Sequence, residues 1–295
     1  MKLYAPLYYQ KFTCIADKCR HSCCVGWEID IDSDTLCKYA ALTAPYGKEI
    51  QCSVGMEGTP HFKLLPDDRC PHLDDKGLCR IITALGEGYL CDICREHPRF
   101  YNDTPHGREV GLGLSCEEAC RIILSAQNYQ DFAEIGEAEG APLAGFDPIP
   151  HRKRIYGILS DTALPYPKRL CAIADAYGLS LSRRTDGDWQ ALLASLEYLD
   201  DTHRPLFAAY TSDAQTPKEA EKPLERALAY FIYRHCTEVQ SEGELRAALG
   251  FALFCERLLA AMIKKGLGTA ADLARILSEE LEYSEENTAA IKNMF

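Results

Sequence analysis

The spacing of apolar residues changes along this chain of 295 residues. From residue 153 onward, apolar side chains recur every three or four positions, as in "KPLERALAYFIYRHC" and "GELRAALGFALFCERLLAAMIKKG". This recurrence places the apolar side chains on one face of a helix. The stretch "PYPKRLCAIADAYG" also begins with Pro and ends with Gly, which is the usual asymmetry of helix termini. The pattern predicts a helical bundle in this half of the chain.

The first 130 residues carry shorter and less regular patterns. "GWEIDID" alternates apolar and acidic residues, which is typical of a short half-buried strand. "SDTLCKYAAL" and "SCEEACRIILSA" indicate helices that begin at Ser33 or Asp34 and at Ser115. "GEAEGAPLAGFDPIPHR" is rich in Gly and Pro, which is typical of a linker. We predict a mainly α fold with little β structure, divided into a cysteine-rich metal-cluster domain (1–130), a linker (131–152) and a helical domain (153–295).

The overall composition indicates a folded chain without a membrane anchor. Apolar residues make up 47% of the sequence, which excludes a disordered protein. No apolar run approaches the roughly 18–20 residues that a membrane helix needs. The opening "MKLYAPLYYQKF" has neither the apolar stretch nor the cleavage site of a secretory signal. We therefore expect a cytoplasmic protein that does not bind a membrane.

The formal net charge of −12 bears on the kind of partner. Phosphate contacts depend on Lys and Arg, so nucleic acid is not expected as a partner. A lysine-bearing protein would be attracted over long range by this charge. The alternative is that the charge only keeps the protein soluble.

Cysteine is the most informative residue type in the sequence. There are 15 cysteines, and 12 of them precede residue 121. Reducing compartments disfavour structural disulfides, so clustered cysteines in them more often bind metal or carry out redox chemistry. The other three, Cys171, Cys236 and Cys255, stand alone in helical patterns, and we expect them to pack as small apolar side chains.

The clustered cysteines have the spacing of metal ligands. They occur as Cys14-x4-Cys19-x3-Cys23-Cys24, Cys70-x8-Cys79, Cys91-x2-Cys94 and Cys116-x3-Cys120. Short spacings let one loop direct two thiolates toward one ion. A nearly all-sulfur ligand supply favours zinc or an iron–sulfur cluster. Adjacent Cys23 and Cys24 diverge, so they serve two metal atoms or one of them only packs. The alternative for the whole set is simple burial.

Five stretches, read in order, resemble the flagellin lysine-N-methylase family and a related group of cysteine-rich domains described as zinc- or iron-chelating. Four of them lie in the first 125 residues: "PLYYQKFTCIADKCRHSCCVGWEIDID", "RCPHLDDKGLCRI", "LGEGYLCDICREHPRFYN" and "LGLSCEEACRIIL". The fifth, "EYSEENTAAI", is similar to the Glu-His-Ser-Glu-Glu-Asn stretch that closes the family's sequences. The resemblance to the rest of the helical half is weak.

The resemblance implies a site and a reaction. Cys91 and Cys120 fall where the family varies, and we leave them out of the ligand set. The resemblance implies an iron–sulfur cluster, with [4Fe–4S] favoured over zinc, S-adenosylmethionine as methyl donor, and flagellin or another lysine-bearing protein as partner. Eight thiols would form two neighbouring sites, or one cluster supported by the other four. The implied metal ligands are Cys14, Cys19, Cys23, Cys24, Cys70, Cys79, Cys94 and Cys116.

The sequence departs from the family at two positions, where Tyr283 replaces an expected His and Glu279 replaces an expected Arg. It shows no Gly-rich nucleotide-binding loop, so the donor pocket stays unassigned. Methylating a lysine requires a neutral amine, although its ordinary pKa is about 10.4, so a base or desolvation is needed. No catalytic residue can be chosen. The acidic and phenolic candidates near the cysteines, each with a structural alternative, are Glu28, Asp30, Asp32, Glu87, Tyr89, Asp92 and Tyr101.

Three functions remain open from the sequence. The leading one is an S-adenosylmethionine-dependent protein-lysine N-methyltransferase that acts on flagellin. The second is a non-catalytic zinc or iron–sulfur module that docks a partner. The third is an iron–sulfur redox protein.

Overall fold

The computed structural model describes residues 1–180, 183–212 and 216–295. About half of these residues are helical, and a small mixed sheet supplies most of the strands. The chain packs into two compact units. One is continuous, Thr13–Pro98, and we call it the cysteine unit. The other joins Met1–Phe12 to Arg99–Phe295, and we call it the helical unit.

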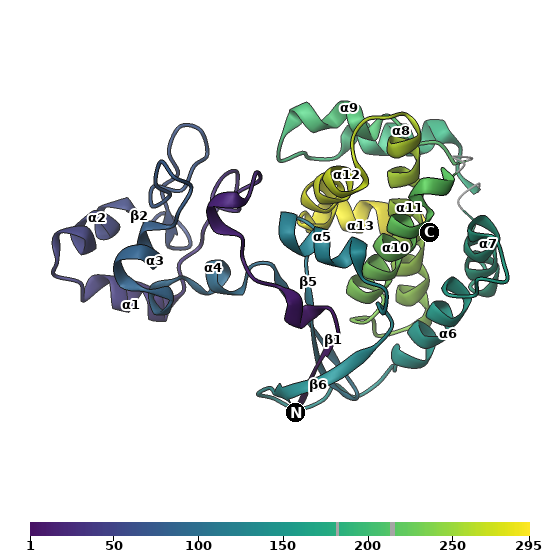
Figure 1. Cartoon of the computed structure of the whole chain (residues 1–295), viewed down its shortest axis with the longest axis horizontal. Helices are drawn as coiled ribbons and strands as arrows, with labels where there is room; N and C mark the ends of the chain where they lie inside the picture. The colour runs from purple at the N-terminus through teal and green to yellow at the C-terminus, as the bar shows by residue number, and fades with distance from the viewer. Residues whose placement is uncertain (181–182, 213–215) are drawn as a thin grey trace. The chain divides into compact units, whose positions relative to one another are not determined.

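The cysteine unit is built from short elements (Figure 1). Asp32 caps its first helix by accepting a hydrogen bond from the Thr35 N–H at 2.8 Å, so the cap lies just before the predicted Ser33 or Asp34. Nine buried residues form the core of the unit. The elements are η2 Ala16–Lys18, α1 Ser33–Ala40, α2 Pro45–Ser53, β2 Val54–Gly55, β3 His61–Phe62, α3 Arg80–Leu85, η3 Glu87–Tyr89 and α4 Asp92–Glu96.

The predicted strand at "GWEIDID" is extended backbone with little pairing. Ile29 and Ile31 are buried and Asp30 is exposed, as the alternation indicates. The segment pairs with β3 only through an isolated bridge between Asp30 and His61, with hydrogen bonds from the Ile31 N–H to the Pro60 carbonyl and from the Phe62 N–H to the Ile29 carbonyl. The alternation therefore predicted burial correctly, whereas the strand assignment is wrong because no continuous ladder forms.

The sheet of the helical unit has the order β4-β5-β1-β6. Its strands are β1 Lys2–Pro6, β4 Arg99–Thr104, β5 Gly107–Leu112 and β6 Phe132–Glu137, with η1 Tyr9–Lys11 following β1. β1 runs parallel to β5 and antiparallel to β6, and β4 and β5 form a hairpin. Gly107 has a φ of 139°, and a Cβ there would lie 2.5 Å from the Lys2 carbonyl oxygen, so the close approach of β1 requires glycine. The expectation of little β structure before residue 130 misses this sheet.

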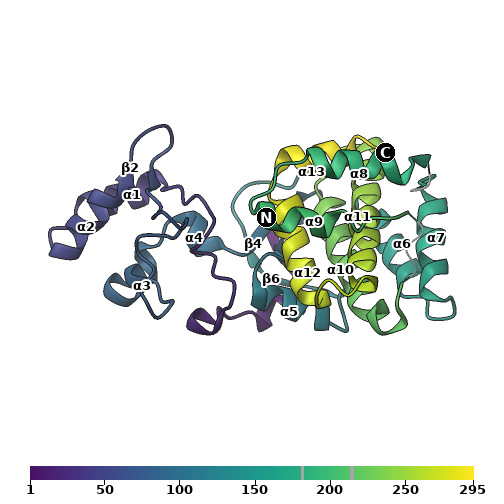
Figure 2. The ribbon, with the colours of Figure 1, turned by 90° about the horizontal axis from the view of Figure 1, so that it is seen from above.

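Two central helices, α10 Glu221–His235 and α11 Glu242–Lys264, organise the rest of the helical unit (Figures 1 and 2). Both are largely buried, as their apolar spacing predicts. The other helices pack around them: α5 Glu117–Ser125, α6 Ile149–Leu159, α7 Tyr166–Ala176, α8 Asp186–Ser195, α9 Arg204–Phe207, α12 Ala270–Leu277 and α13 Glu285–Lys292, with single turns η5 Asp201–His203 and η6 Lys218–Ala220.

Trp189 lies in the middle of the helical unit's core. It is fully buried, and its ring centroid lies 4.6 Å from that of Phe254, 5.6 Å from Tyr210 and 5.5 Å from Phe295. A buried ion pair also joins the sheet to α6, because Arg152 donates to both oxygens of Glu109 at 2.6 and 2.7 Å. α6 begins inside the predicted linker, which also contains β6. The compact units thus divide the chain differently from the three predicted segments.

The last predicted helical stretch is interrupted. A π-helical turn, η7 Ser278–Glu282, separates α12 from α13. In this turn the side chains of Glu280, Leu281 and Glu282 are all buried, although two of them carry a carboxylate. The turn therefore directs two carboxylates into the interior of the helical unit.

Candidate functional site

Five thiols gather around the small core of the cysteine unit. Cys70 and Cys91 belong to this core, and Cys24, Cys79 and Cys94 pack against it. We call these five residues the sulfur core. Their apolar neighbours include Ile29, Ile31, Ile50, Phe62, Ile81 and Leu90.

Backbone contacts fix the sulfur core from several segments. The Cys70 N–H donates to the Cys24 carbonyl at 2.8 Å, so these two loops lie side by side. Cys79 immediately precedes α3 and pairs with Leu73 through an isolated bridge. Cys91 precedes α4, and Cys94 lies one turn further along the same helix, so both face the same side. The unit's loops and helix starts therefore converge on sulfur.

The thiols interact with one another. The Cys94 thiol donates toward Cys91 and lowers the pKa of Cys91, whereas the same bond and burial raise the pKa of Cys94. A hydrogen bond from Cys23 lowers the pKa of Cys24 to about 7. Burial raises the pKa of Cys70 to about 12. Without a bound cation, the sulfur core therefore holds a mixture of protonated and ionisable thiols.

Backbone N–H groups also point at the sulfurs. The His72 N–H lowers the pKa of Cys70, and those of Ile82 and Ile81 lower the pKa of Cys79, in both cases against the larger effect of burial. N–H groups that face a sulfur stabilise its thiolate form. Hydrogen bonds of this kind to thiolate ligands also tune iron–sulfur clusters.

His72 lies beside the sulfur core but has no free nitrogen. Its Nε2 is 2.8 Å from the Ser53 hydroxyl. That hydroxyl donates its proton to the Ile50 carbonyl, so Nε2 must be the donor to Ser53. Its Nδ1 is 3.2 Å from the Tyr46 hydroxyl, which must therefore be the donor to it. Burial lowers the pKa of His72 to about 4. A neutral imidazole with both nitrogens occupied has a structural role here and is not a metal ligand.

Tyr39 is the buried phenol of the sulfur core. Its hydroxyl donates to the Tyr89 carbonyl at 2.7 Å and lies 3.6 Å from the Cys91 sulfur. Burial, followed by the nearby thiols, raises the pKa of Tyr39 strongly. The phenol thus stays protonated, with its one proton directed at the Tyr89 carbonyl and its oxygen beside the Cys91 sulfur.

The structure places the eight predicted ligands unevenly. Cys24, Cys70, Cys79 and Cys94 lie in the sulfur core, and Cys23 is exposed but interacts with Cys24. Cys14 is exposed, and Cys19 donates to the His21 carbonyl at 3.2 Å. Cys116 occupies the N-cap position of α5 in the helical unit, without a capping hydrogen bond from its side chain. Among the three isolated cysteines, Cys236 and Cys255 are buried as expected, but Cys171 is exposed.

The sulfur core fits a soft metal by its chemistry. It offers up to five thiols with N–H donors around them, which is the ligand type that zinc and iron–sulfur clusters select. The side chains are positioned for bonds to one another: over residues 1–180, 183–212 and 216–295, no three His, Cys, Asp or Glu side chains are arranged to hold one ion. Metal binding would therefore replace thiol–thiol contacts by metal–sulfur bonds, with release of protons.

Two of the family-like stretches meet inside the helical unit, at Tyr230. Its hydroxyl donates to Glu282 at 3.1 Å, in "EYSEEN", and accepts from the Leu114 N–H at 3.3 Å, in "LGLSC". It also accepts from Arg234 at 3.0 Å. His235 lies 2.7 Å from the other oxygen of Glu282. This buried network holds the segment that leads to Cys116 against the C-terminal helices.

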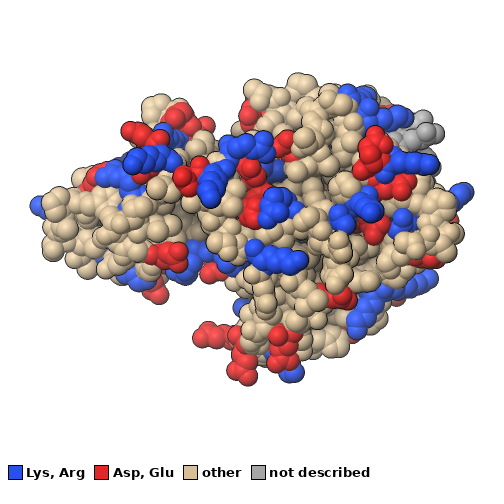
Figure 3. Space-filling view, viewed as in Figure 1, with Lys and Arg blue, Asp and Glu red and all other residues tan. Residues whose placement is uncertain are grey.

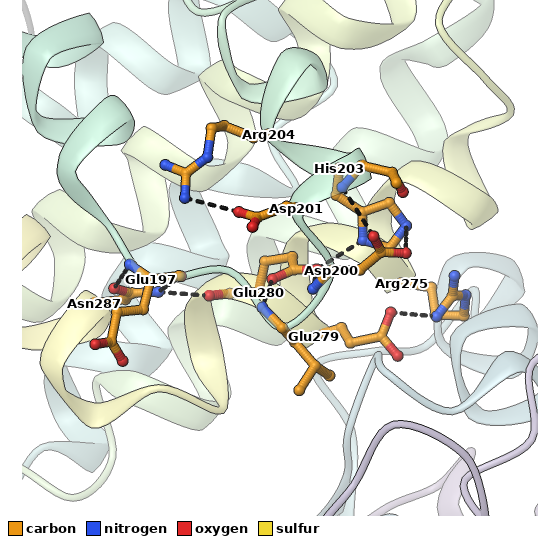
Figure 4. A network of polar contacts seen from close by, with 11 residues as sticks. Glu197, Asp200, Asp201, His203, Arg204, Arg275, Glu279, Glu280 and Asn287 are labelled. Carbon is orange, nitrogen blue, oxygen red and sulfur yellow. Dashed lines mark hydrogen bonds and ion pairs between the residues drawn. The ribbon is translucent and has the colours of Figure 1, made fainter. Parts of the chain in front are cut away.

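A second network clamps the loop before α9 (Figure 4). The buried Glu280 accepts hydrogen bonds from the Leu199 and Asp200 N–H groups at 2.6 and 3.2 Å, and lies 2.7 Å from His203 Nδ1. Asn287 donates to the Glu197 and Glu280 carbonyls at 2.7 and 2.8 Å. Glu280 of η7 and Asn287 of the closing stretch therefore fix this loop.

Both departures from the family pattern have local partners. Glu279 forms an ion pair with Arg275 at 2.5 Å (Figure 4). Tyr283 is 37% exposed, and its ring lies 4.8 Å from the Arg234 guanidinium. Sequence reasoning did not select Tyr39, Cys91, Tyr230, Arg234 or Glu282. Two of them carried a sequence signal: Cys91 forms a Cys-x2-Cys pair with Cys94, and Glu282 opens the family-like stretch "EYSEEN".

The chain is similar to curated proteins of flagellar bacteria. A lysine-N-methylase of Salmonella typhimurium is 28% identical over 143 residues, which is 44% of this chain and 34% of that protein. A lysine-N-methylase of Salmonella choleraesuis matches to the same extent. The flagellar biosynthetic protein FliU of Salmonella muenchen is 30% identical over 139 residues, which is 45% of this chain and 80% of FliU.

No protein-family model and no solved structure matches the chain. The aligned part spans about a third of the length of the curated lysine-N-methylases. The match to FliU covers most of that protein. This chain therefore belongs to the family of flagellar lysine-N-methylases and FliU proteins.

Proposed function

We propose that the protein is an S-adenosylmethionine-dependent lysine N-methyltransferase that acts on flagellin. The observation that carries this proposal is the similarity to proteins named lysine-N-methylase and flagellar biosynthetic protein FliU. Because the aligned part is about a third of the length of the lysine-N-methylases, the activity, the donor and the substrate are all part of the proposal.

The reaction has simple requirements. The unshared electron pair of a neutral lysine amine attacks the methyl carbon of the sulfonium, the carbon–sulfur bond breaks, and S-adenosylhomocysteine leaves. The amine then gives up one proton. The enzyme must hold nitrogen, carbon and sulfur in line and must keep the amine neutral, by desolvation or with a base.

The surface charge supports a lysine-bearing substrate more than a nucleic acid. The net charge is −12. On the face shown in Figure 3, acidic and basic side chains are interspersed. An acidic protein attracts cationic side chains over long range without a basic groove for phosphates. In the part of the chain that the structure describes, no helix has the length and apolar character needed to span a bilayer.

We further propose that the sulfur core binds an iron–sulfur cluster, with zinc as the alternative. Thiol donors and the N–H groups that face them support this assignment. When bound, a cluster would supply an electron-transfer centre and a crosslink between the loops that carry the cysteines. The chain's own contribution is to orient the thiols and to exclude water from them.

A methyl-transfer assay tests the proposal. The chain is purified without oxygen and incubated with S-adenosylmethionine labelled in its methyl group and with flagellin. We expect label in flagellin lysines, located by peptide mass spectrometry. Flagellin whose lysines have been acetylated is the matched control, because its amines have lost their nucleophilic electron pair. Metal-loaded chain that transfers no label to unmodified flagellin would contradict the proposal.

A partner-docking module is the second candidate, and the limited coverage of the lysine-N-methylases favours it. A docking module would bind flagellin without consuming S-adenosylmethionine. Measuring flagellin binding by calorimetry on the same samples separates the two functions, since only the enzyme forms S-adenosylhomocysteine.

A further inference from the structure

We infer that Cys91 is one of the ligands of the metal bound by the sulfur core, and that its fellow ligands come from Cys24, Cys70, Cys79 and Cys94. This inference rests on the proposed metal site and revises its ligand set. The family resemblance left Cys91 out and included Cys14, Cys19 and Cys116. The structure instead groups the five sulfurs of the cysteine unit that lie against one core.

The surroundings of Cys91 distinguish it from a cysteine that only packs. It is 1% exposed, its thiol accepts from Cys94, and the Tyr39 hydroxyl lies 3.6 Å from its sulfur. Cys70 lies in the same small core, and Cys79 packs against it. Polar groups and sulfurs thus surround it, although its burial matches that of an apolar residue.

Cys120 shows what a packing cysteine looks like in the same protein. It is also 1% exposed and also varies in the family, and it also belongs to a closely spaced pair. Its thiol donates to the Ala271 carbonyl at 3.4 Å, and it packs in the large apolar core of the helical unit with Cys116 and Arg275 nearby. Equal burial therefore accompanies two different environments, and only that of Cys91 is rich in sulfur.

The small core of the cysteine unit also favours stabilisation by a crosslink. Its core has nine buried residues, its longest helix has nine residues, and its two strands have two residues each. Domains with so little core generally depend on disulfides or metal. The five cysteines of the sulfur core form no disulfide. A metal held by Cys91 and ligands from the other four would join segments among α3, α4 and the loops at Cys24 and Cys70.

The test compares Cys91→Ser with Cys120→Ser in the full chain. Each variant is loaded without oxygen with Fe²⁺ and sulfide, and bound iron and sulfide are measured before and after exposure to a chelator. We expect Cys91→Ser to lose metal at least about tenfold faster than the parent, and Cys120→Ser to match the parent. Retention of parental iron by Cys91→Ser would overturn the inference.

A second variant keeps the test decisive if serine unfolds the unit. Cys91→His retains a metal-binding side chain, and Co²⁺ reports the ligand type in its absorption spectrum. We expect Cys91→His either to bind Co²⁺ with a weaker thiolate band and shifted ligand-field bands, or to lose Co²⁺ that Cys120→His retains. A Cys91→His spectrum identical to that of the parent would rule Cys91 out.

The same samples separate this inference from the proposed enzyme. A parent chain that binds neither iron nor Co²⁺ would overturn the ligand set and the metal site, whatever the methyl-transfer assay shows. A parent chain that binds metal through Cys91 but never methylates flagellin would uphold the ligand set and contradict only the proposed activity.

Discussion

The two units of this protein are stabilised in different ways. Among the described residues, the helical unit buries fifty hydrophobic residues in one cluster around α10 and α11, and α11 alone has 23 residues. The cysteine unit buries nine, and two of these are cysteines. Burial of apolar surface stabilises the first unit. The second has less apolar surface to bury, so we expect the proposed metal and its thiol ligands to contribute to its stability.

Buried polar groups follow the same division. The helical unit encloses full charges, such as the Glu109–Arg152 pair and the Glu282 network, and supplies each with several hydrogen bonds. Buried ions need such partners to offset desolvation. The buried polar groups of the cysteine unit include thiols, one phenol and one neutral imidazole. Charge could enter this core through a metal and its thiolates.

Removal of metal should have the largest effect and should separate the two units. After chelation, we expect the amides of α1 to α4 to exchange with solvent, because metal binding and folding are coupled in small metal domains. Amides of α10 and α11 should keep their protection. Hydrogen exchange read by mass spectrometry measures both in one sample. Equal loss of amide protection in both units, or no loss in either, would contradict the proposed difference between them.

Removing a large side chain from the core of the helical unit should have the next largest effect and should not change the metal content. Trp189→Ala removes a fully buried ring and should lower the free energy of unfolding by about 3–5 kcal/mol. Urea denaturation followed by circular dichroism measures this loss. Iron content should equal that of the parent. The half-buried Trp27 of the cysteine unit provides the matched control, and a loss of iron in Trp189→Ala alone would contradict the division.

A pH dependence should mark the helical unit. Burial raises the pKa of Glu256 to about 7. Between the ordinary pKa of Glu, about 4.3, and this value, the unfolded chain releases its proton first, so the helical unit loses stability as the pH rises through this window. Glu256→Gln should reduce this pH-dependent loss of unfolding free energy by about 2–3 kcal/mol. Urea midpoints at about pH 5 and about pH 8 test this, and equal pH dependence in parent and variant would exclude Glu256 as the cause.

Disrupting the Asn287 hydrogen bonds that fix the loop before α9 should have the smallest effect of the four changes. Asn287→Ala leaves the Glu197 and Glu280 carbonyls without their amide donor, which should cost about 1–3 kcal/mol. Asn293→Ala is the control, because Asn293 is exposed at the end of α13, and it should change stability by less than about 0.5 kcal/mol. Thermal unfolding of the two variants gives the difference. Equal effects would show that the clamp is redundant.

The helical half was the most predictable part of the fold. Apolar residues at three- and four-residue spacing in α10 and α11 predicted both helices, because burial on one face leaves a periodic signal. The π-helical turn at Ser278–Glu282 was not predictable, since its inward carboxylates break that period. The sheet was missed because β1 pairs with strands that follow about a hundred residues later, and such pairing leaves no local pattern.

The candidate site was predictable in its residue type more than in its members. Cysteine spacing identified the region, and four predicted ligands, Cys24, Cys70, Cys79 and Cys94, lie in the sulfur core. The family resemblance, and not the spacing, included the exposed Cys14 and left out the enclosed Cys91, and neither source of prediction reports burial. The Tyr230 network was invisible for the same reason as the sheet, since it joins residues far apart in the chain.

The pairing of β1 with β5 and β6 has a consequence for the order of events during synthesis. β1 is made first, but its two partner strands leave the ribosome only after the whole of Thr13–Pro98. The strand must therefore wait, unpaired, while the cysteines emerge. Any factor that delivers metal to the nascent chain would therefore meet those thiols before β1 has paired with β5 and β6.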